Sequence, residues 1–266
     1  MFENHNALCV DARKPRKTAV REGAIATTER PMYKSNRNYK VPRNRSNQIW
    51  RYMSLASFIS VLQKSQLFFT TLDRLDDPFE GRILLPKELL IGNKIIPVEG
   101  LLLKSLANQQ TEGRRRICVN CWHINDGESA AMWALYSKES GIAIQSTIVR
   151  LQRSFGSEPR DVCVGEVNYH DYTGRELIAM RQFESLHMTK RRSFEHEREI
   201  RAVVEVSSYV HKYGIYISVD LPMLIERIYV SPVAPKWIAS VVEGVMKRYG
   251  IANMELIHSG LYRIDE

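Results

Sequence analysis

Three charged side chains recur at every second position where a charged segment passes into an apolar one, SFEHEREIRAVVEV. A strand that begins near Glu197 places Glu197, Glu199 and Arg201 on one face, because strand side chains alternate. The row is either a solvated line of ion pairs or the wall of a cleft. On a cleft wall, its carboxylates and guanidinium become candidates for binding and catalysis.

A second acidic group lies in the turn DDPFEG, which contains Asp76, Asp77 and Glu80. In one interpretation the turn is a corner, where Pro78 fixes φ and an Asp side chain caps the turn. In another, these carboxylates and those of residues 195–199 share Mg²⁺ in a nuclease or hydrolase. Nothing in the spacing requires a metal ion, and we expect none.

Two aromatic residues, Trp133 and Tyr136, lie three positions apart in SAAMWALYSK, which predicts a helix over residues 129–138. At this spacing the two rings are neighbours on one side of the helix. They form either a core pair or a platform on which a flat heterocycle stacks.

The four cysteines are too few and too scattered for a disulfide framework, which suits a reducing compartment. Cys118 and Cys121 form a single C-x-x-C motif within a predicted strand at residues 117–123. Their side chains point to opposite faces of a strand, which hinders joint ligation of zinc. We interpret the motif as structural.

Positive charge is concentrated at the start of the chain. Of the 266 residues, 44% are apolar and 26% are charged, and the formal net charge is +8. Residues 1–48 hold eleven Lys and Arg against four Asp and Glu, a net charge of +7, so the remainder is nearly neutral. We predict a basic, mostly disordered arm over residues 1–47 and a single α+β domain over residues 48–266.

Several protein classes lack their signatures. No apolar run reaches the roughly 18 residues of a membrane span, and the first residues lack the apolar core of a secretory signal. We therefore expect a cytoplasmic protein. The P-loop, Rossmann, zincin and hydrolase-elbow motifs are absent from the sequence.

The predicted elements that position these residues begin with a strand at residues 49–54, which carries Arg51 and Tyr52 on opposite faces. An amphipathic helix capped by Ser54 follows, and then a strand at residues 66–71. Further helices are predicted over residues 84–90, 98–108, 148–155, 175–190 and 235–249. Residues 92–97 are predicted as a loop and residues 114–116 as a strand entry. Further strands are predicted over residues 141–147, 161–169, 215–219, 228–230 and 254–258.

Four short motifs in a fixed order resemble a known family. They are an Arg-Tyr opening, the DDPFEG turn, an MWALY helix before the strand GIAI, and the E-x-E-x-R segment. This order is similar to that of the bacterial domain-of-unknown-function family 2971, over about residues 48–250.

The layout is also similar to that of mono-ADP-ribosyltransferases, particularly toxin-type enzymes that modify DNA. This resemblance implies an α+β fold with a split, bent mixed β-sheet flanked by helices, and NAD as the substrate in its cleft. It implies that Arg51 holds the pyrophosphate or the adjoining ribose, since a guanidinium binds phosphate in a bidentate manner. Tyr52 belongs to the same cofactor-binding group.

The same resemblance assigns chemistry to the charged row. Glu199 is implied to accept from the nicotinamide ribose 2′-OH and to stabilise the oxocarbenium-like charge as the glycosidic bond breaks. Glu197 orients or deprotonates the acceptor, and Tyr136 stacks on the nicotinamide together with Trp133. Arg201 holds either Glu199 or a phosphate.

Two functions therefore stay open. The first is an NAD-dependent transferase that modifies nucleic acid or protein, as a toxin or phage-defence effector. The second is a non-catalytic module of the same fold that binds a nucleotide or nucleic acid. In the second case Arg51 and Arg201 contribute to affinity, but replacing Glu199 by Gln is harmless. Neither function fixes the oligomeric state.

Overall fold

The computed structural model describes residues 39–82, 88–91, 94–97, 100–137, 140–170, 186–207 and 213–264. By its contacts the chain divides into Met1–Arg30 and Pro31–Glu266, and every described residue belongs to the second unit. Its helices are α1 (Leu55–Lys64), α2 (Gly100–Arg116), α3 (Ala130–Tyr136), α4 (Ile148–Ser154), α5 (Leu221–Leu224) and α6 (Lys236–Arg248), with the 3₁₀ helices η1 (Leu72–Arg74) and η3 (Arg192–Glu197). Its strands are β1 (Gln48–Ser54), β2 (Gln66–Thr71), β3 (Glu88–Ile91), β4 (Lys94–Pro97), β5 (Ile117–Ile124), β6 (Gly141–Thr147), β7 (Cys163–Glu166), β8 (Asn168–His170), β9 (Thr189–Arg191), β10 (Glu199–Glu205), β11 (Gly214–Ser218), β12 (Arg227–Val230) and β13 (Glu255–His258).

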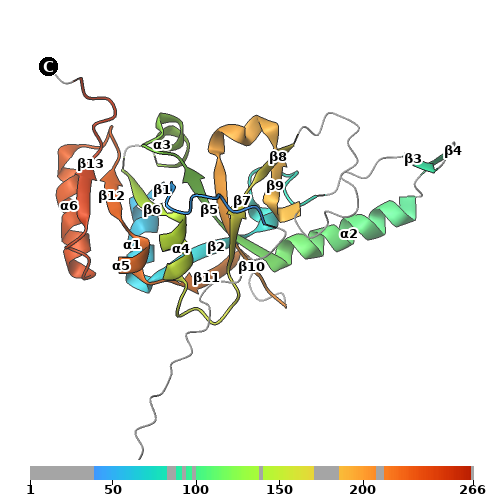
Figure 1. Cartoon of the computed structure of the whole chain (residues 1–266), viewed down its shortest axis with the longest axis horizontal. Coiled ribbons are helices and arrows are strands. Elements are labelled where there is room, and N and C mark those ends of the chain that lie inside the picture. Colours follow the sequence, from blue (N-terminus) through green and yellow to red (C-terminus); the bar gives the residue numbers. More distant parts are fainter. Residues whose placement is uncertain are drawn as a thin grey trace, which may run out of the picture. The chain divides into compact units, whose positions relative to one another are not determined.

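One mixed sheet of nine strands organises the domain (Figure 1). Its main order is β11-β2-β5-β1-β6-β12-β13, and β10 pairs with β5 and β7. Strands β12 and β13 run parallel, whereas the other pairs of this sheet are antiparallel. The expected α+β class, with a mixed sheet flanked by helices, is confirmed.

The sheet is split along one edge of β5. On its other edge, β5 pairs with β10 from Ile117 to His123. On the split edge, β2 pairs with Cys118 and Val119, whereas β1 pairs with His123 and Ile124. Between these two pairings β1 and β2 diverge, and an opening is left in the backbone ladder.

Side-chain alternation gives the sheet two buried faces. In β1, Ile49 and Met53 point into the larger core, to which α1, α4, α5 and α6 contribute apolar residues. Trp50 and Tyr52 point to the opposite face, where they pack with Trp133 of α3. Figure 1 shows α3 apart from the group formed by α1, α4 and α5.

The opening unit forms as its sequence predicts. The hydroxyl of Ser54 accepts from the backbone N–H of Ser57 at 3.2 Å, so it caps α1. The buried stripe of α1 includes Phe58 and Leu62, and the predicted strand at residues 66–71 is β2. Helix α1 ends at Lys64, and the φ of 50° at its C-cap residue Ser65 turns the chain directly into β2.

The region before β5 corrects three predictions. Residues 88–90 of the predicted helix and residues 94–97 of the predicted loop form the β3–β4 hairpin, and residues 84–87 lie outside the described residues. Short apolar runs fit either period, and here β-branched Ile91, Ile95 and Ile96 favour the strand. Helix α2 extends to Arg116, so Arg114–Arg116 are its last turn and not a strand entry.

Three boundaries in the second half also differ from prediction. The predicted strand over residues 161–169 is broken into β7 and β8. Residues 189 and 190 of the predicted helix are in strand β9, and residues 175–185 lie outside the described residues. Strand β10 begins at Glu199, because Glu197 ends η3 and Arg198 takes a left-handed φ of 40°.

The predicted arm over residues 1–47 is described from Tyr39 onward. The carbonyl of Lys40 accepts from the N–H of Glu166 at 2.7 Å, and that of Arg45 accepts from Val149 at 3.0 Å. The last residues of the predicted arm therefore pack on the domain. Residues 1–38 lie outside the described residues.

Candidate active site

A cavity of about 540 Å³ opens beside the split in the sheet. Its wall contains residues of β1, β2, β5, β10, α3 and η3 and of the acidic turn. The lining residues that matter below are Arg51, Tyr52, Phe68, Glu80, Cys121, His123, Met132, Leu135, Tyr136, Lys190, Glu197 and Glu199. Residues far apart in the sequence therefore meet at one site.

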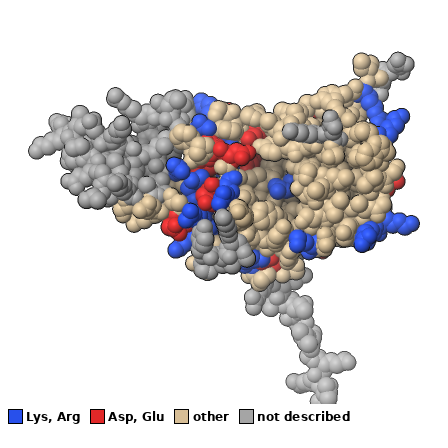
Figure 2. Space-filling model, turned by 180° about the vertical axis from the view of Figure 1, so that it is seen from behind, with Lys and Arg blue, Asp and Glu red and all other residues tan. Residues whose placement is uncertain are grey.

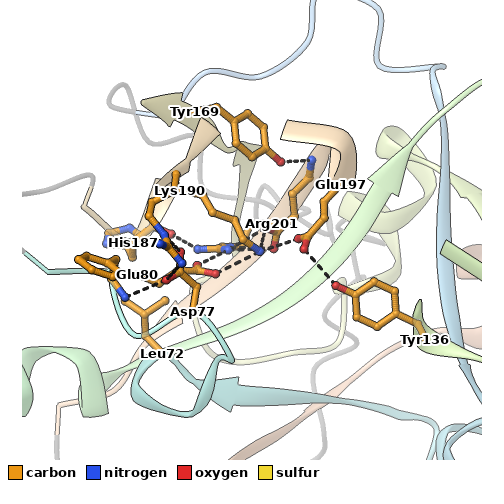
Figure 3. Close-up of polar contacts among 12 residues, drawn as sticks. Leu72, Asp77, Glu80, Tyr136, Tyr169, His187, Lys190, Glu197 and Arg201 are labelled. Atoms are coloured by element: carbon orange, nitrogen blue, oxygen red, sulfur yellow. Dashed lines mark hydrogen bonds and ion pairs between the residues drawn. The ribbon is translucent and has the colours of Figure 1, made fainter. Parts of the chain in front are cut away.

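The wall at β10 rests on a buried ion cluster (Figure 3). Arg201, with 0% of its side chain exposed, donates to both carboxylate oxygens of Glu199 at 2.8–3.0 Å and to Glu80 at 2.7 Å. Its Nη1 also donates to the carbonyl of His187 at 2.6 Å. Such a cluster is costly to desolvate and costly to break once it is formed.

The cluster holds Glu199 as an anion at neutral pH. Burial acts to raise the pKa of Glu199, but Arg201 and Lys190 outweigh it and lower that pKa below its usual range. The N–H of Glu199 also donates to the Tyr169 hydroxyl at 2.9 Å, which fixes the start of β10. A carboxylate of fixed charge and position thus faces the cavity.

Arg51 lies at the split itself. Its Nη1 donates to the carbonyl of Cys121 at 2.5 Å, at the point where β5 lacks a strand partner on that edge. Arg51 also lines the cavity that contains Glu199. The remaining guanidinium donors suit a phosphate or another anion.

The aromatic residues separate into two groups. Tyr136 is 47% exposed, lines the cavity and donates its hydroxyl to Glu197 Oε1 at 3.2 Å. Trp133 is 3% exposed and packs edge-on against Tyr52, with ring centroids 4.9 Å apart, and it is not among the residues that line the cavity. The predicted pair is thus divided, and Trp133 belongs to the core.

Tyr52 lines the cavity and also packs in the cluster that contains Trp133. It is 8% exposed, and its hydroxyl accepts from the N–H of Ser129, the N-cap of α3, at 2.9 Å.

Arg201 does not line the cavity, because it lies behind Glu199. The alternative in which Arg201 holds Glu199 is therefore the one that the geometry supports.

Sequence reasoning missed Lys190 and His123 as site residues and left Glu80 as a possible corner. Lys190 was expected in a helix without a functional signal. His123 lies opposite Glu199 in the β5–β10 ladder, and its Nδ1 donates to the carbonyl of Glu197 at 2.6 Å. That carbonyl can only accept, so Nε2 is the acceptor nitrogen of the neutral ring. Burial lowers the pKa of His123, which favours this neutral form.

Charges of both signs are mixed around the site. Figure 2 shows acidic and basic side chains side by side on one face of the molecule. Among the described residues, no group of three or more His, Cys, Asp or Glu side chains is arranged to hold a metal ion. Within the described part of the chain, no helix is long and apolar enough to cross a membrane.

Comparisons with known proteins give a distant structural likeness. No family model and no curated protein matches the chain, so the resemblance to family 2971 is not supported. DarT of Thermus sp. 2.9 in complex with NAD+ has a TM-score of 0.40 and 10% identity, covering 83% of this chain and 98% of that chain. DarT in complex with ADP-ribosylated ssDNA has a TM-score of 0.39 and 10% identity, and this match covers 82% of this chain and 95% of that chain. A likeness this distant supports no argument about function, so function must be argued from the residues that line the cavity.

Proposed function

We propose that the cavity binds NAD+ and that the protein transfers its ADP-ribose to an acceptor, as a mono-ADP-ribosyltransferase. One observation carries this proposal: Arg51, Tyr136, Glu197 and Glu199 line the same cavity. These are the residues to which the sequence resemblance assigns this chemistry.

Binding of NAD+ follows from the chemistry of the walls. Arg51 pairs with the pyrophosphate through its remaining donors, in a half-buried position where charge pairing is stronger than in water. The ring of Tyr136 stacks on the nicotinamide, and Met132 and Leu135 of the same helix extend the apolar wall.

The transfer step uses the two carboxylates. The bond between C1′ of the ribose and the nicotinamide nitrogen breaks, and nicotinamide leaves with the electron pair. Glu199 stabilises the positive charge that develops at C1′. The acceptor then bonds to C1′ and gives its proton to Glu197. Arg201 holds Glu199 from outside the cavity and does not touch the substrate, and Glu80 pairs with the same guanidinium.

A second candidate is a non-catalytic nucleotide-binding module. It is favoured by one feature, that both carboxylate oxygens of Glu199 already accept from Arg201. Under this function the cavity binds NAD+ or a related dinucleotide without breaking the glycosidic bond. Release of nicotinamide by the purified protein, with and without DNA, RNA or lysate, separates the two candidates.

Replacing Arg51 by Met is expected to raise the Kd for NAD+ about tenfold or more, because a charge-assisted pair with phosphate is lost. Calorimetry on the folded variant measures this change. Arg51→Lys is the matched variant, which keeps the charge but loses the fork, and its effect is expected to be intermediate. Unchanged affinity in Arg51→Met would exclude the pyrophosphate role.

A surface beside the cavity suits a nucleic-acid acceptor. Phe68, which lines the cavity, and Tyr216 of the edge strand β11 are 37% and 41% exposed, with ring centroids 5.1 Å apart. Lys64 lies 4.8 Å from the Tyr216 ring, and Arg160 donates to the Tyr216 carbonyl at 2.9 Å. Exposed rings among cations are typical of surfaces on which single strands stack.

Tyr216→Ala is therefore expected to weaken the binding of a single-stranded oligonucleotide about tenfold, since stacking contributes roughly 1–3 kcal/mol per base. Fluorescence anisotropy at two salt concentrations measures the effect. Tyr262→Ala is the control, because Tyr262 is 57% exposed and follows β13 at the other end of the sheet order. Equal binding by both variants would favour a protein acceptor.

A further inference from the structure

Lys190 of β9 lies at the centre of the carboxylates around the cavity. Its Nζ is 2.5 Å from Glu197 Oε2, 3.1 Å from Glu80 Oε1 and 3.5 Å from Glu199 Oε2 (Figure 3). Its side chain is 9% exposed, and it lines the cavity. One ammonium thus bridges the acidic turn, the end of η3 and the start of β10.

Lys190 and Arg201 share Glu80 and Glu199 as partners and differ at Glu197. Arg201 pairs with Glu80 and Glu199. In the described part of the chain, the ion pair of Glu197 is with Lys190. Two cations therefore face three carboxylates, and Glu197 depends on Lys190.

The two oxygens of Glu197 have separate partners. Oε2 accepts from Lys190 at 2.5 Å, and Oε1 accepts from the Tyr136 hydroxyl at 3.2 Å. Because Glu197 ends a 3₁₀ helix just before the left-handed Arg198, it has no strand neighbours to hold its side chain in place. The direction of its carboxylate is set by these two contacts.

Groups on every surrounding element favour a charged Lys190. Glu80 faces it from the acidic turn, Glu197 from η3 and Glu199 from β10, and all three raise its pKa although burial acts to lower it. The ring of Phe194 in η3 lies 5.0 Å from Nζ and adds a cation–π contact. Arg201 of β10, Tyr169 of β8 and Tyr136 of α3 complete the surroundings of the cluster.

We infer that Lys190 is a positioning residue of the site: its ammonium fixes Oε2 of Glu197 and so directs Oε1 toward Tyr136 and the cavity. This role rests on the proposed function, in which Glu197 receives the proton of the acceptor. Without the ammonium, Glu197 faces Glu80 and Glu199 with no cation of its own, and like-charge repulsion moves its carboxylate away. Lys190 thereby acts on the reaction through Glu197.

The first test compares Lys190→Met with the wild type in ADP-ribose transfer, measured as nicotinamide release in the presence of a single-stranded oligonucleotide. We expect kcat to fall about tenfold or more, since small displacements of a reacting group have large effects on rate. The KM for NAD+ is expected to change little, because Arg51 and Tyr136 stay in place. Lys40→Met is the matched control, since Lys40 forms an exposed ion pair with Glu166, at 3.3 Å and with 72% of its side chain exposed.

Lys190→Met combined with Glu80→Gln covers the case in which the single variant does not fold. The double variant removes one cation and one carboxylate together, so the net charge of the cluster is unchanged. We expect it to fold and still to lose kcat, because Oε2 of Glu197 has lost its partner. Wild-type kcat in either folded variant would overturn the inference.

A spectroscopic readout separates this inference from the proposed function. Tyrosine labelled with ¹³C at Cζ reports the hydrogen bond of Tyr136, and Tyr136→Phe assigns its signal. We expect Lys190→Met to shift this signal, and Lys40→Met to leave it unchanged. An unshifted signal would overturn the positioning role. If the wild type releases no nicotinamide, the proposed function fails, while the tyrosine signal still decides the placement of Glu197.

Discussion

Glutamine in place of Glu199 is expected to reduce nicotinamide release by about 100-fold or more, the usual effect of removing a group that stabilises charge in the transition state. The amide keeps the size of the side chain but cannot balance the charge that develops at C1′. The affinity for NAD+ is expected to change little, because the ground-state contacts through Arg51 remain. Single-turnover assays and calorimetry on the same preparation measure the two quantities.

A control on the same strand makes this prediction specific. Glu205 ends β10 at an exposed position, so Glu205→Gln removes an equal charge from the strand without touching the cavity. Release by Glu199→Gln at the rate of Glu205→Gln would sink the transferase proposal. In that case tight NAD+ binding by both variants would support the non-catalytic module.

The lowered pKa of Glu199 predicts over which pH range its carboxylate stays charged. The Glu199 anion contributes to the stability of the fold above its unfolded pKa of about 4.3. This contribution is lost as the pH falls through the lower pKa that Glu199 has in the folded protein. We therefore expect Glu199 itself to cause no loss of release between pH 7 and pH 5.

Methionine in place of Arg201 is expected to lower the free energy of unfolding by about 3–5 kcal/mol, the typical effect of removing one partner of a buried ion pair. Glu80 and Glu199 remain, with 1% and 4% of their side chains exposed, and Lys190 alone must balance them. Urea unfolding at pH 7 measures the loss. As the pH falls, the Glu199 carboxylate takes up a proton, and it does so first in the variant because Arg201 no longer lowers its pKa, so the difference from the wild type shrinks.

An exposed arginine supplies the comparison. Arg227 pairs with Glu255 at 2.6 Å, with 39% and 58% of the two side chains exposed. Replacing Arg227 by Met is expected to lower the free energy of unfolding far less than Arg201→Met does, because exposed pairs contribute little. A similar small loss for Arg201→Met would show that the buried cluster does not hold the site together.

Local patterns in the sequence determined much of the scaffold. The cap at Ser54, the strand β2 and the alternation of Ile49 and Met53 against Trp50 and Tyr52 follow from spacings of two to four residues. Such spacings describe one element at a time, so they survive any arrangement of the rest. The hairpin β3–β4 was predicted incorrectly because a short apolar run fits both periods.

Four residues that the sequence analysis proposed for the site line one cavity. Arg51, Tyr136, Glu197 and Glu199 were predicted from their motifs, and the fold brings them to one cavity. Trp133 was grouped with Tyr136 because helical spacing shows which side chains are neighbours. It does not show which side of the helix meets the core.

Only the tertiary structure decided which charged residues from distant parts of the sequence lie together. The split along β5 opens the sheet beside Arg51, and it depends on which strands pair with each end of that edge. Lys190 and Glu80 join Glu199 because β9 and the acidic turn lie against β10, and no local pattern encodes that contact. The sequence by itself determined the chemical groups and the elements of Arg51, Tyr136 and Glu199. Pairing between distant strands determined which groups share the cavity and which, like Arg201, support it from behind.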